Sequence, residues 1–160
     1  MRGMVISILI AVIAAMGSVP VNAGSFEDAV AAHEEGDYLT AYALWLPLAQ
    51  QGNAAAQFNL GNMFRNGNGV RQDLVEANRW YKKAAEQGHA WAQTNLGAMY
   101  ANGLGVLQDY VLSYKWFEIA AKMGNANAVK NRDIIAERMS PAMITEGQKM
   151  ASEWLKGHNR

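Results

Sequence analysis

Asparagine side chains at a fixed spacing are the residues of this 160-residue chain best suited to binding chemistry. Asn59, Asn95 and Asn131 follow one another at intervals of 36 residues. A carboxamide both donates and accepts hydrogen bonds, so such a series can pair with the backbone of a peptide. The same series can instead tie each helix to an adjacent loop or helix. The sequence leaves both roles open.

Residues that could support catalysis are few and poorly spaced. The chain has no cysteine, which excludes a disulfide, a zinc–thiolate site and a thiolate nucleophile. His33, His89 and His158 do not share a ligand spacing on one helix face. The glycine loops lack the Gly-Lys-Ser/Thr ending of phosphate loops, and no Gly-x-Ser-x-Gly motif occurs. We therefore predict no enzyme, no metal site and no cofactor.

A further group of candidate binding residues differs between two similar segments, 54–89 and 90–125. Within each segment the differing positions are separated by steps of three and four residues, and the last of them are Arg65 in the first segment and Ala101 in the second. Such spacing places each set on one face of a helix. Large apolar residues on such a face suggest that it binds a partner. The alternative is an exposed face whose residues vary because no contact constrains them. The predicted partner-binding residues are Ala55, Phe58, Asn59, Asn62, Trp91, Thr94, Asn95, Ala98 and Asn131.

The two segments are copies of one structural unit, because half of their positions are identical after a shift of 36 residues. Each copy predicts two antiparallel helices joined by a glycine-rich loop. Asp73 and Asp109 are expected to cap the second helices, and Glu76 completes a capping-box pattern in the first copy. The predicted helices cover 54–64, 74–87, 90–100 and 110–122.

Glycines inside the first helix of each copy predict close contacts between helices. Gly61 and Gly97 each cost the helix about 1 kcal/mol relative to alanine, so a packing role is expected. We expect the indoles of Trp80 and Trp116 to fill the space beside them and to be buried.

Weaker copies flank the two clear ones. Ser25 and Asp28 predict a capped helix over 26–35, and a second helix over 37–52 follows it. Ser140 and Pro141 open a last helix that closes the stack. The predicted organisation is a signal peptide at 1–23, a degenerate repeat at 24–53, full repeats at 54–89 and 90–125, and capping helices at 126–160.

Three linked motifs make this repeat specific: A-x-A-Q-x-N-L-G-x-M-[FY], G-x-G-V-x-Q-D and W-[YF]-x-x-A-A-x-x-G. Together they resemble the Sel-one-like repeat, a relative of the tetratricopeptide repeat, over 26–155. The resemblance implies an all-α solenoid of stacked antiparallel helix pairs. It also implies a scaffold or adaptor that binds a protein or peptide segment on the concave face lined by the first helices.

The N-terminal residues predict export. Arg2 precedes an apolar run over 4–16, and Val21-Asn22-Ala23 places small residues at the −3 and −1 positions of a cleavage site. The run is shorter than the roughly 20 residues of a membrane span, and a retained anchor is the alternative. We therefore expect a periplasmic or secreted protein.

Bulk charge and composition narrow the partners only coarsely. The formal net charge is +0, so nucleic acid is not an expected partner. A protein or peptide segment is the predicted ligand. A small envelope hydrolase or a glycan-binding protein is the alternative function. The oligomeric state is not determined by the sequence.

Overall fold

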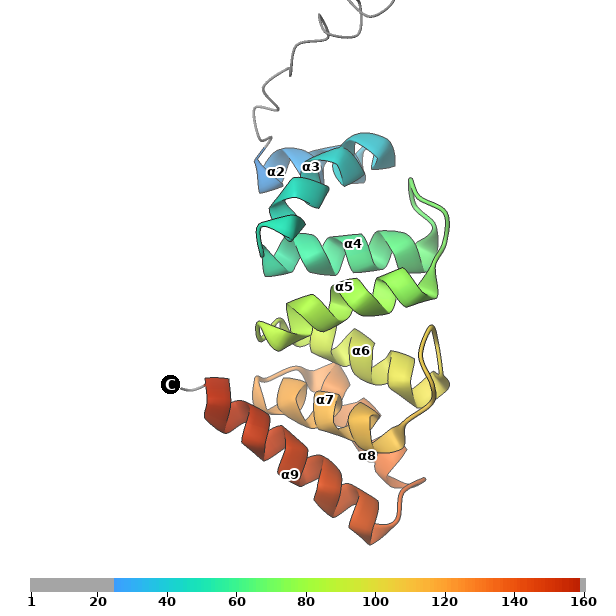
Figure 1. Cartoon of the computed structure of the whole chain (residues 1–160), viewed down its shortest axis with the longest axis vertical. Coiled ribbons are helices and arrows are strands. Elements are labelled where there is room, and N and C mark those ends of the chain that lie inside the picture. The colour runs from blue at the N-terminus through green and yellow to red at the C-terminus, as the bar shows by residue number, and fades with distance from the viewer. Residues whose placement is uncertain (1–24, 159–160) are drawn as a thin grey trace, which may run out of the picture.

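Helices stack in antiparallel pairs along the computed structural model, which describes residues 25–158 (Figure 1). Within that range every regular element is an α-helix. The elements are α2 (Phe26–Glu34), α3 (Tyr38–Gln50), α4 (Ala54–Asn66), α5 (Leu74–Glu86), α6 (Ala90–Asn102), α7 (Tyr110–Lys122), α8 (Ala126–Ala136) and α9 (Pro141–His158). The fold is therefore the predicted all-α solenoid.

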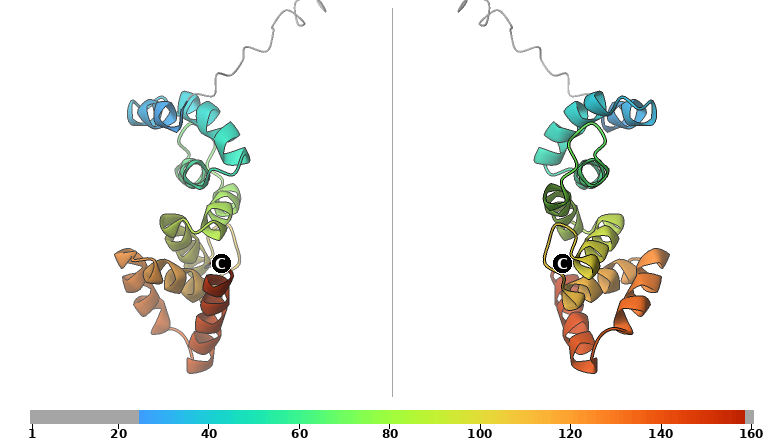
Figure 2. Two further views of the ribbon diagram at one scale, coloured as in Figure 1. Left: turned by 90° about the vertical axis from the view of Figure 1, so that its left-hand side faces the viewer. Right: turned by 90° about the vertical axis from the view of Figure 1, so that its right-hand side faces the viewer.

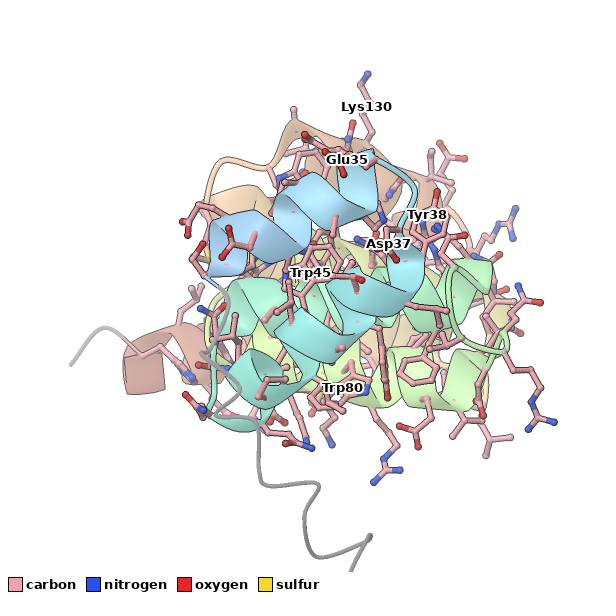
Figure 3. All side chains as sticks on the ribbon, turned by 90° about the horizontal axis from the view of Figure 1, so that it is seen from above. Glu35, Asp37, Tyr38, Trp45, Trp80 and Lys130 are labelled. Atoms are coloured by element: carbon pink, nitrogen blue, oxygen red, sulfur yellow. The ribbon has the colours of Figure 1, made fainter. Side chains whose placement is uncertain are left out.

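The stack is curved, and the first helix of each antiparallel pair lies on its inner side (Figure 2). The first and last of the even-numbered helices, α2 and α8, reach toward the same side, with α4 and α6 between them. Seen from above, Glu35 and Lys130 project to this side and Trp80 to the opposite one (Figure 3). The even-numbered helices thus line a concave face.

Side-chain caps explain where the helices begin. The side chains of Asn53, His89 and Asn125 each accept a hydrogen bond from the third backbone N–H of the helix that follows. The capping box predicted at Ser25 forms. The side chain of Asp73 caps α5, but Glu76 forms an ion pair with Arg79 instead of completing the box. Helices α4 and α6 continue two residues beyond their predicted ends.

The loops between paired helices rest on the preceding repeat. Gly69 and Gly105 have φ angles of 70° and 69° and lie against the backbone of Tyr38 and Leu74. Only glycine adopts this conformation readily, and no side chain would fit beside the neighbouring backbone. The glycine-rich loop therefore joins successive repeats as well as the two helices of one repeat.

The contacts at the helical glycines differ from the prediction. Gly61 lies against the ring of Tyr81, and Gly97 lies against the ring of Phe117. Trp116 is buried, with 4% of its surface exposed, but Trp80 is only half-buried. The prediction that the tryptophans lie beside the glycines is therefore wrong. The residue that follows each tryptophan, Tyr81 or Phe117, is the one that faces the glycine of the paired helix.

The C-terminal helix covers one of these tryptophans. Helix α9 packs on α7, where Gly147 lies against Tyr114 and the rings of Trp116 and Trp154 are 6.2 Å apart. Trp80 on α5 is instead a half-buried ring that packs against the core cluster of α2, α3 and α4. None of the helices in residues 25–158 is long and apolar enough to cross a membrane. The predicted signal peptide at 1–23 lies outside the described residues.

Candidate functional site

A hollow of about 500 Å³ is formed mainly by the even-numbered helices of the concave face, in the N-terminal half of the stack. We call it the first hollow. Helices α2, α4 and α6 supply most of its walls, with Trp45 from α3 and Asn68 from the loop after α4. Its lining residues are Val30, His33, Glu34, Trp45, Phe58, Asn59, Asn62, Arg65, Asn66, Asn68 and Asn95.

Two of its asparagines are fixed by a hydrogen-bond network. The Tyr81 hydroxyl donates to Oδ1 of Asn62 at 2.6 Å, and Nδ2 of Asn95 donates to the same oxygen at 3.5 Å. Burial raises the pKa of Tyr81 to about 12, so the phenol stays protonated and remains a donor. Asn95 therefore does link α6 to α4, which is one of the two roles that the asparagine series allowed.

Other polar groups of the first hollow keep free hydrogen-bonding capacity. Asn59 is half-buried, and its carboxamide makes no hydrogen bond with any residue of 25–158. Nε of Arg65 donates to Oδ1 of Asn66 at 3.3 Å, which leaves the rest of the guanidinium available. Glu34 forms no ion pair in the described part of the chain. These groups can donate to and accept from a ligand.

Aromatic rings form the apolar part of the first hollow. Phe58 stacks on the imidazole of His89, with ring centroids 4.7 Å apart. His33 lies against Trp45 at 5.4 Å. His89 also caps α6, because its Nδ1 accepts from the Ala92 N–H at 3.2 Å. Burial lowers the pKa of His89, which favours the neutral imidazole that this cap requires.

A second hollow of about 180 Å³ lies one repeat further along, between α6 and α8. Its lining residues are Ala98, Ala101, Asn102, Phe117, Asn131, Ile134, Ile135 and Arg138. The first five correspond, after a shift of 36 residues, to Asn62, Arg65, Asn66, Tyr81 and Asn95. All of these except Tyr81 line the first hollow, so four positions of the repeat contribute to both hollows with different chemistry.

The structure separates the predicted binding residues into groups. Phe58, Asn59, Asn62 and Asn95 line the first hollow, and Ala98 and Asn131 line the second. The remaining three, Ala55, Trp91 and Thr94, line neither hollow.

Thr94 and Trp91 lie apart from the concave hollows for different reasons. Thr94 is 6% exposed, and its hydroxyl donates to the Ala90 carbonyl at 2.9 Å, so it is an internal residue of α6. Trp91 is 54% exposed, but it lies in a shallow hollow beside Met123, where the chain turns from α7 to α8. Helical spacing predicts that Thr94 and Trp91 share one stripe of α6. The stacking of the next repeat determines which part of that stripe remains accessible to a ligand.

Sequence reasoning missed the contribution of the first helix pair. Val30, His33, Glu34 and Trp45 line the first hollow but belong to the degenerate repeat. The turn between α2 and α3 has three residues, 35–37, whereas seven residues, 67–73, separate α4 from α5. The spacing between α2 and α4 is therefore 32 residues, and a search at 36 does not align them. At 32, His33 and Glu34 coincide with Arg65 and Asn66.

Nothing in the described residues resembles a metal centre. No group of three or more histidine, aspartate and glutamate side chains in residues 25–158 is arranged to hold an ion. Glu34 is the one carboxylate among the residues that line the first hollow, and none lines the second. The arrangement is suited to hydrogen bonding and apolar contact.

Comparisons with known proteins agree with this architecture. The family model described as Sel1 repeat matches residues 54–89 and 92–125. A protective antigen present in uropathogenic Escherichia coli strains, which displays an SLR fold, superposes with a TM-score of 0.79 at 32% sequence identity, over 82% of this chain and 29% of that one. A comparison with curated proteins found no match.

A Sel1 repeat protein from Oxalobacter formigenes is also similar, with a TM-score of 0.68 and 30% identity, over 81% of this chain and 55% of that one. The present chain thus spans a little over half of one of these structures and less than a third of the other. The repeat motifs, the helix pairs and these likenesses together show that the chain contains two Sel1 repeats and shares the fold of the Sel1-repeat proteins to which it is similar.

Proposed function

We propose that this chain is an exported scaffold that binds a peptide segment of a partner protein in the first hollow. Sel1 repeats form a scaffold that commonly mediates protein–protein interaction. The observation that carries the proposal is the lining of the first hollow, where five asparagines stand beside aromatic rings on the concave face. Carboxamides match the alternating donors and acceptors of a peptide backbone.

The order within the hollow supports binding. Tyr81 fixes Asn62, and the stack on His89 fixes the ring of Phe58. Side chains that are already held in place lose little conformational entropy when a ligand binds. Asn59 sits beside them with both its donor and its acceptor free. A peptide that crosses α4 would therefore find an ordered surface with unused hydrogen-bonding groups.

Hydrolysis is less well supported by the same residues. Glycoside hydrolases generally use two carboxyl groups that flank the bond to be broken. Glu34 alone lines the first hollow, so a second carboxyl group would have to come from elsewhere. Glycan binding without hydrolysis would use the same amides and rings, and the experiment below separates it from peptide binding.

A displayed library of random 12-residue peptides, selected on the full protein, tests the proposal. We expect selected peptides to bind Asn59→Ala about two- to tenfold more weakly, because one to two hydrogen bonds are lost. Asn127→Ala, at an exposed asparagine on the edge of the stack, is the matched control and should bind normally. Peptides that bind both variants equally would contradict the site, and competition by peptidoglycan fragments would favour the glycan-binding alternative.

Export is a separate part of the proposal and rests on residues 1–23. We propose that cleavage follows Ala23, so that the exported chain begins at Gly24 and keeps the Ser25 cap of α2. Intact-mass measurement of the protein from the envelope fraction tests this. A mass that still includes Met1, in a membrane fraction, would show that the segment is a retained anchor.

A further inference from the structure

The second hollow has properties that the first lacks. Five of its eight lining residues are apolar, and among them Ile134 is 56% exposed although it belongs to a folded helix. Its volume of about 180 Å³ is similar to the roughly 150 Å³ apolar cavity that holds a benzene molecule in another protein. A single aliphatic side chain is therefore of the right size to fill it.

An uncompensated positive charge stands at the rim of this hollow. Arg138 is the one ionised residue among those lining it, and forms no ion pair with the described residues. Arg132 on the same segment is different, because it binds Glu118 at 2.9 Å and Asp133 at 2.8 Å. A free guanidinium beside an apolar surface favours a partner that brings a carboxylate.

The two hollows share α6 as a wall. This helix supplies Asn95 to the first hollow and Ala98 to the second, and these residues lie one helical turn apart. A segment that lies across α6 can therefore reach both hollows. Asn131 occupies in the second hollow the position that Asn95 occupies in the first, which keeps one carboxamide available beside the apolar surface.

We propose that the second hollow is a specificity subsite, which takes an aliphatic side chain of the bound segment and pairs Arg138 with an aspartate or glutamate next to it. This inference rests on the proposed function, because it assigns part of the same peptide. The polar part of the segment lies in the first hollow, and the aliphatic and acidic part lies over α6 and α8. The partner is thus a peptide with one apolar anchor and a neighbouring carboxylate.

The displayed 12-residue library provides the test. We expect selected peptides to contain leucine, isoleucine or valine followed closely by aspartate or glutamate. Ile134→Asp should weaken their binding by tenfold or more, since a carboxylate replaces the exposed apolar wall. Arg138→Glu should weaken it similarly, and peptides in which the acidic residue is changed to lysine should recover binding to Arg138→Glu. Arg71→Glu, at an exposed arginine in the loop before α5, is the matched control and should bind like the unaltered protein.

The outcomes separate this inference from the proposed function. If Asn59→Ala weakens binding while Ile134→Asp and Arg138→Glu do not, the first hollow is a binding site and the subsite is wrong. Selected peptides without an aliphatic residue would also contradict the subsite. If none of the three variants changes binding, or if no peptide is selected, both the site and the subsite are contradicted. Circular dichroism of each variant checks that it remains folded.

Discussion

Two hollows on one concave face use many equivalent positions of the repeat, yet Asn62, which lines the first, and Tyr81, which lies behind it, are replaced by Ala98 and Phe117, which both line the second. The replacements are coupled. Where the ring carries a hydroxyl, an asparagine accepts its hydrogen bond at 2.6 Å, and where the ring has none, an alanine stands opposite. Each pair avoids a buried polar group without a partner, which would cost about 1–3 kcal/mol.

The comparison also separates scaffold from recognition. Leu60 and Leu96 are fully buried at matching positions, and Gly61 and Gly97 both meet an aromatic ring. These positions hold the helices together, so they cannot vary without a loss of packing. The more exposed residues that line the hollows, such as Asn59 and Ile134, are less constrained by packing. Four predictions test how far the two repeats are equivalent, beginning with the largest expected effect.

Trp116→Ala should destabilise the protein by about 3–5 kcal/mol, as is typical when a buried aromatic residue is removed. Trp80→Ala should cost less than half as much, because Trp80 is half-buried, whereas Trp116 is buried and contacts Trp154 of α9. Urea unfolding followed by circular dichroism measures both. Equal losses would show that α9 does not protect the second repeat.

Gly61→Ala should destabilise by about 1–2 kcal/mol, since overpacking costs more than the gain in helix propensity. A Cβ at this position would lie 2.6 Å from ring atoms of Tyr81, which its hydrogen bond to Asn62 holds in place. Gly97→Ala should cost less, because the ring of Phe117 lines the second hollow and can shift toward it. Thermal unfolding of both variants gives the comparison, and a greater loss for Gly97→Ala would contradict it.

Phe117→Tyr should destabilise by about 1 kcal/mol, because the new hydroxyl meets Ala98 where Tyr81 meets Asn62. Adding Ala98→Asn should restore most of the loss by recreating the pair of the first repeat. The coupling energy from this double-mutant cycle is the measurement. Additive effects of the two substitutions would mean that the pairs are not interchangeable between repeats.

His89→Asn should reduce the pH dependence of stability without removing the cap, because asparagine caps the equivalent helices at Asn53 and Asn125. Burial lowers the folded-state pKa of His89, so the unfolded chain binds the proton more readily. The contribution of the neutral imidazole is present above the unfolded-state pKa and is lost as the pH falls through the folded-state pKa. Urea midpoints at mildly acidic and neutral pH, compared between the variant and the unaltered protein, measure this smallest effect.

Much of the architecture could be predicted from the sequence, since it depends on local signals that repeat. The caps at Ser25, Asp73 and Asp109 act within one helical turn, and the glycines after α5 and α7 end those helices locally. A period of 36 residues then requires that each unit bury its apolar face on the next. These two facts were sufficient for an all-α solenoid.

The candidate site was only partly predictable. Phe58, Asn59 and Asn62 share a helix face and line the first hollow together. Trp91 shares the same spacing but lies at the edge of the stack beside Met123. Spacing within one helix defines a face, but it does not say which part of that face the next repeat will cover.

The sequence by itself determined the helix pairs, their order and the residues at which most helices begin, because hydrogen bonds and caps within a few residues decide those features. Only the tertiary structure decided which side chains meet across repeats: that Tyr81 instead of Trp80 lies against Gly61, that α2 completes the first hollow through a shorter turn, and that α9 covers Trp116. These contacts depend on the angle and register at which packed helices approach each other. Such geometry is set by the fit of many side chains at once and leaves no periodic trace in the chain.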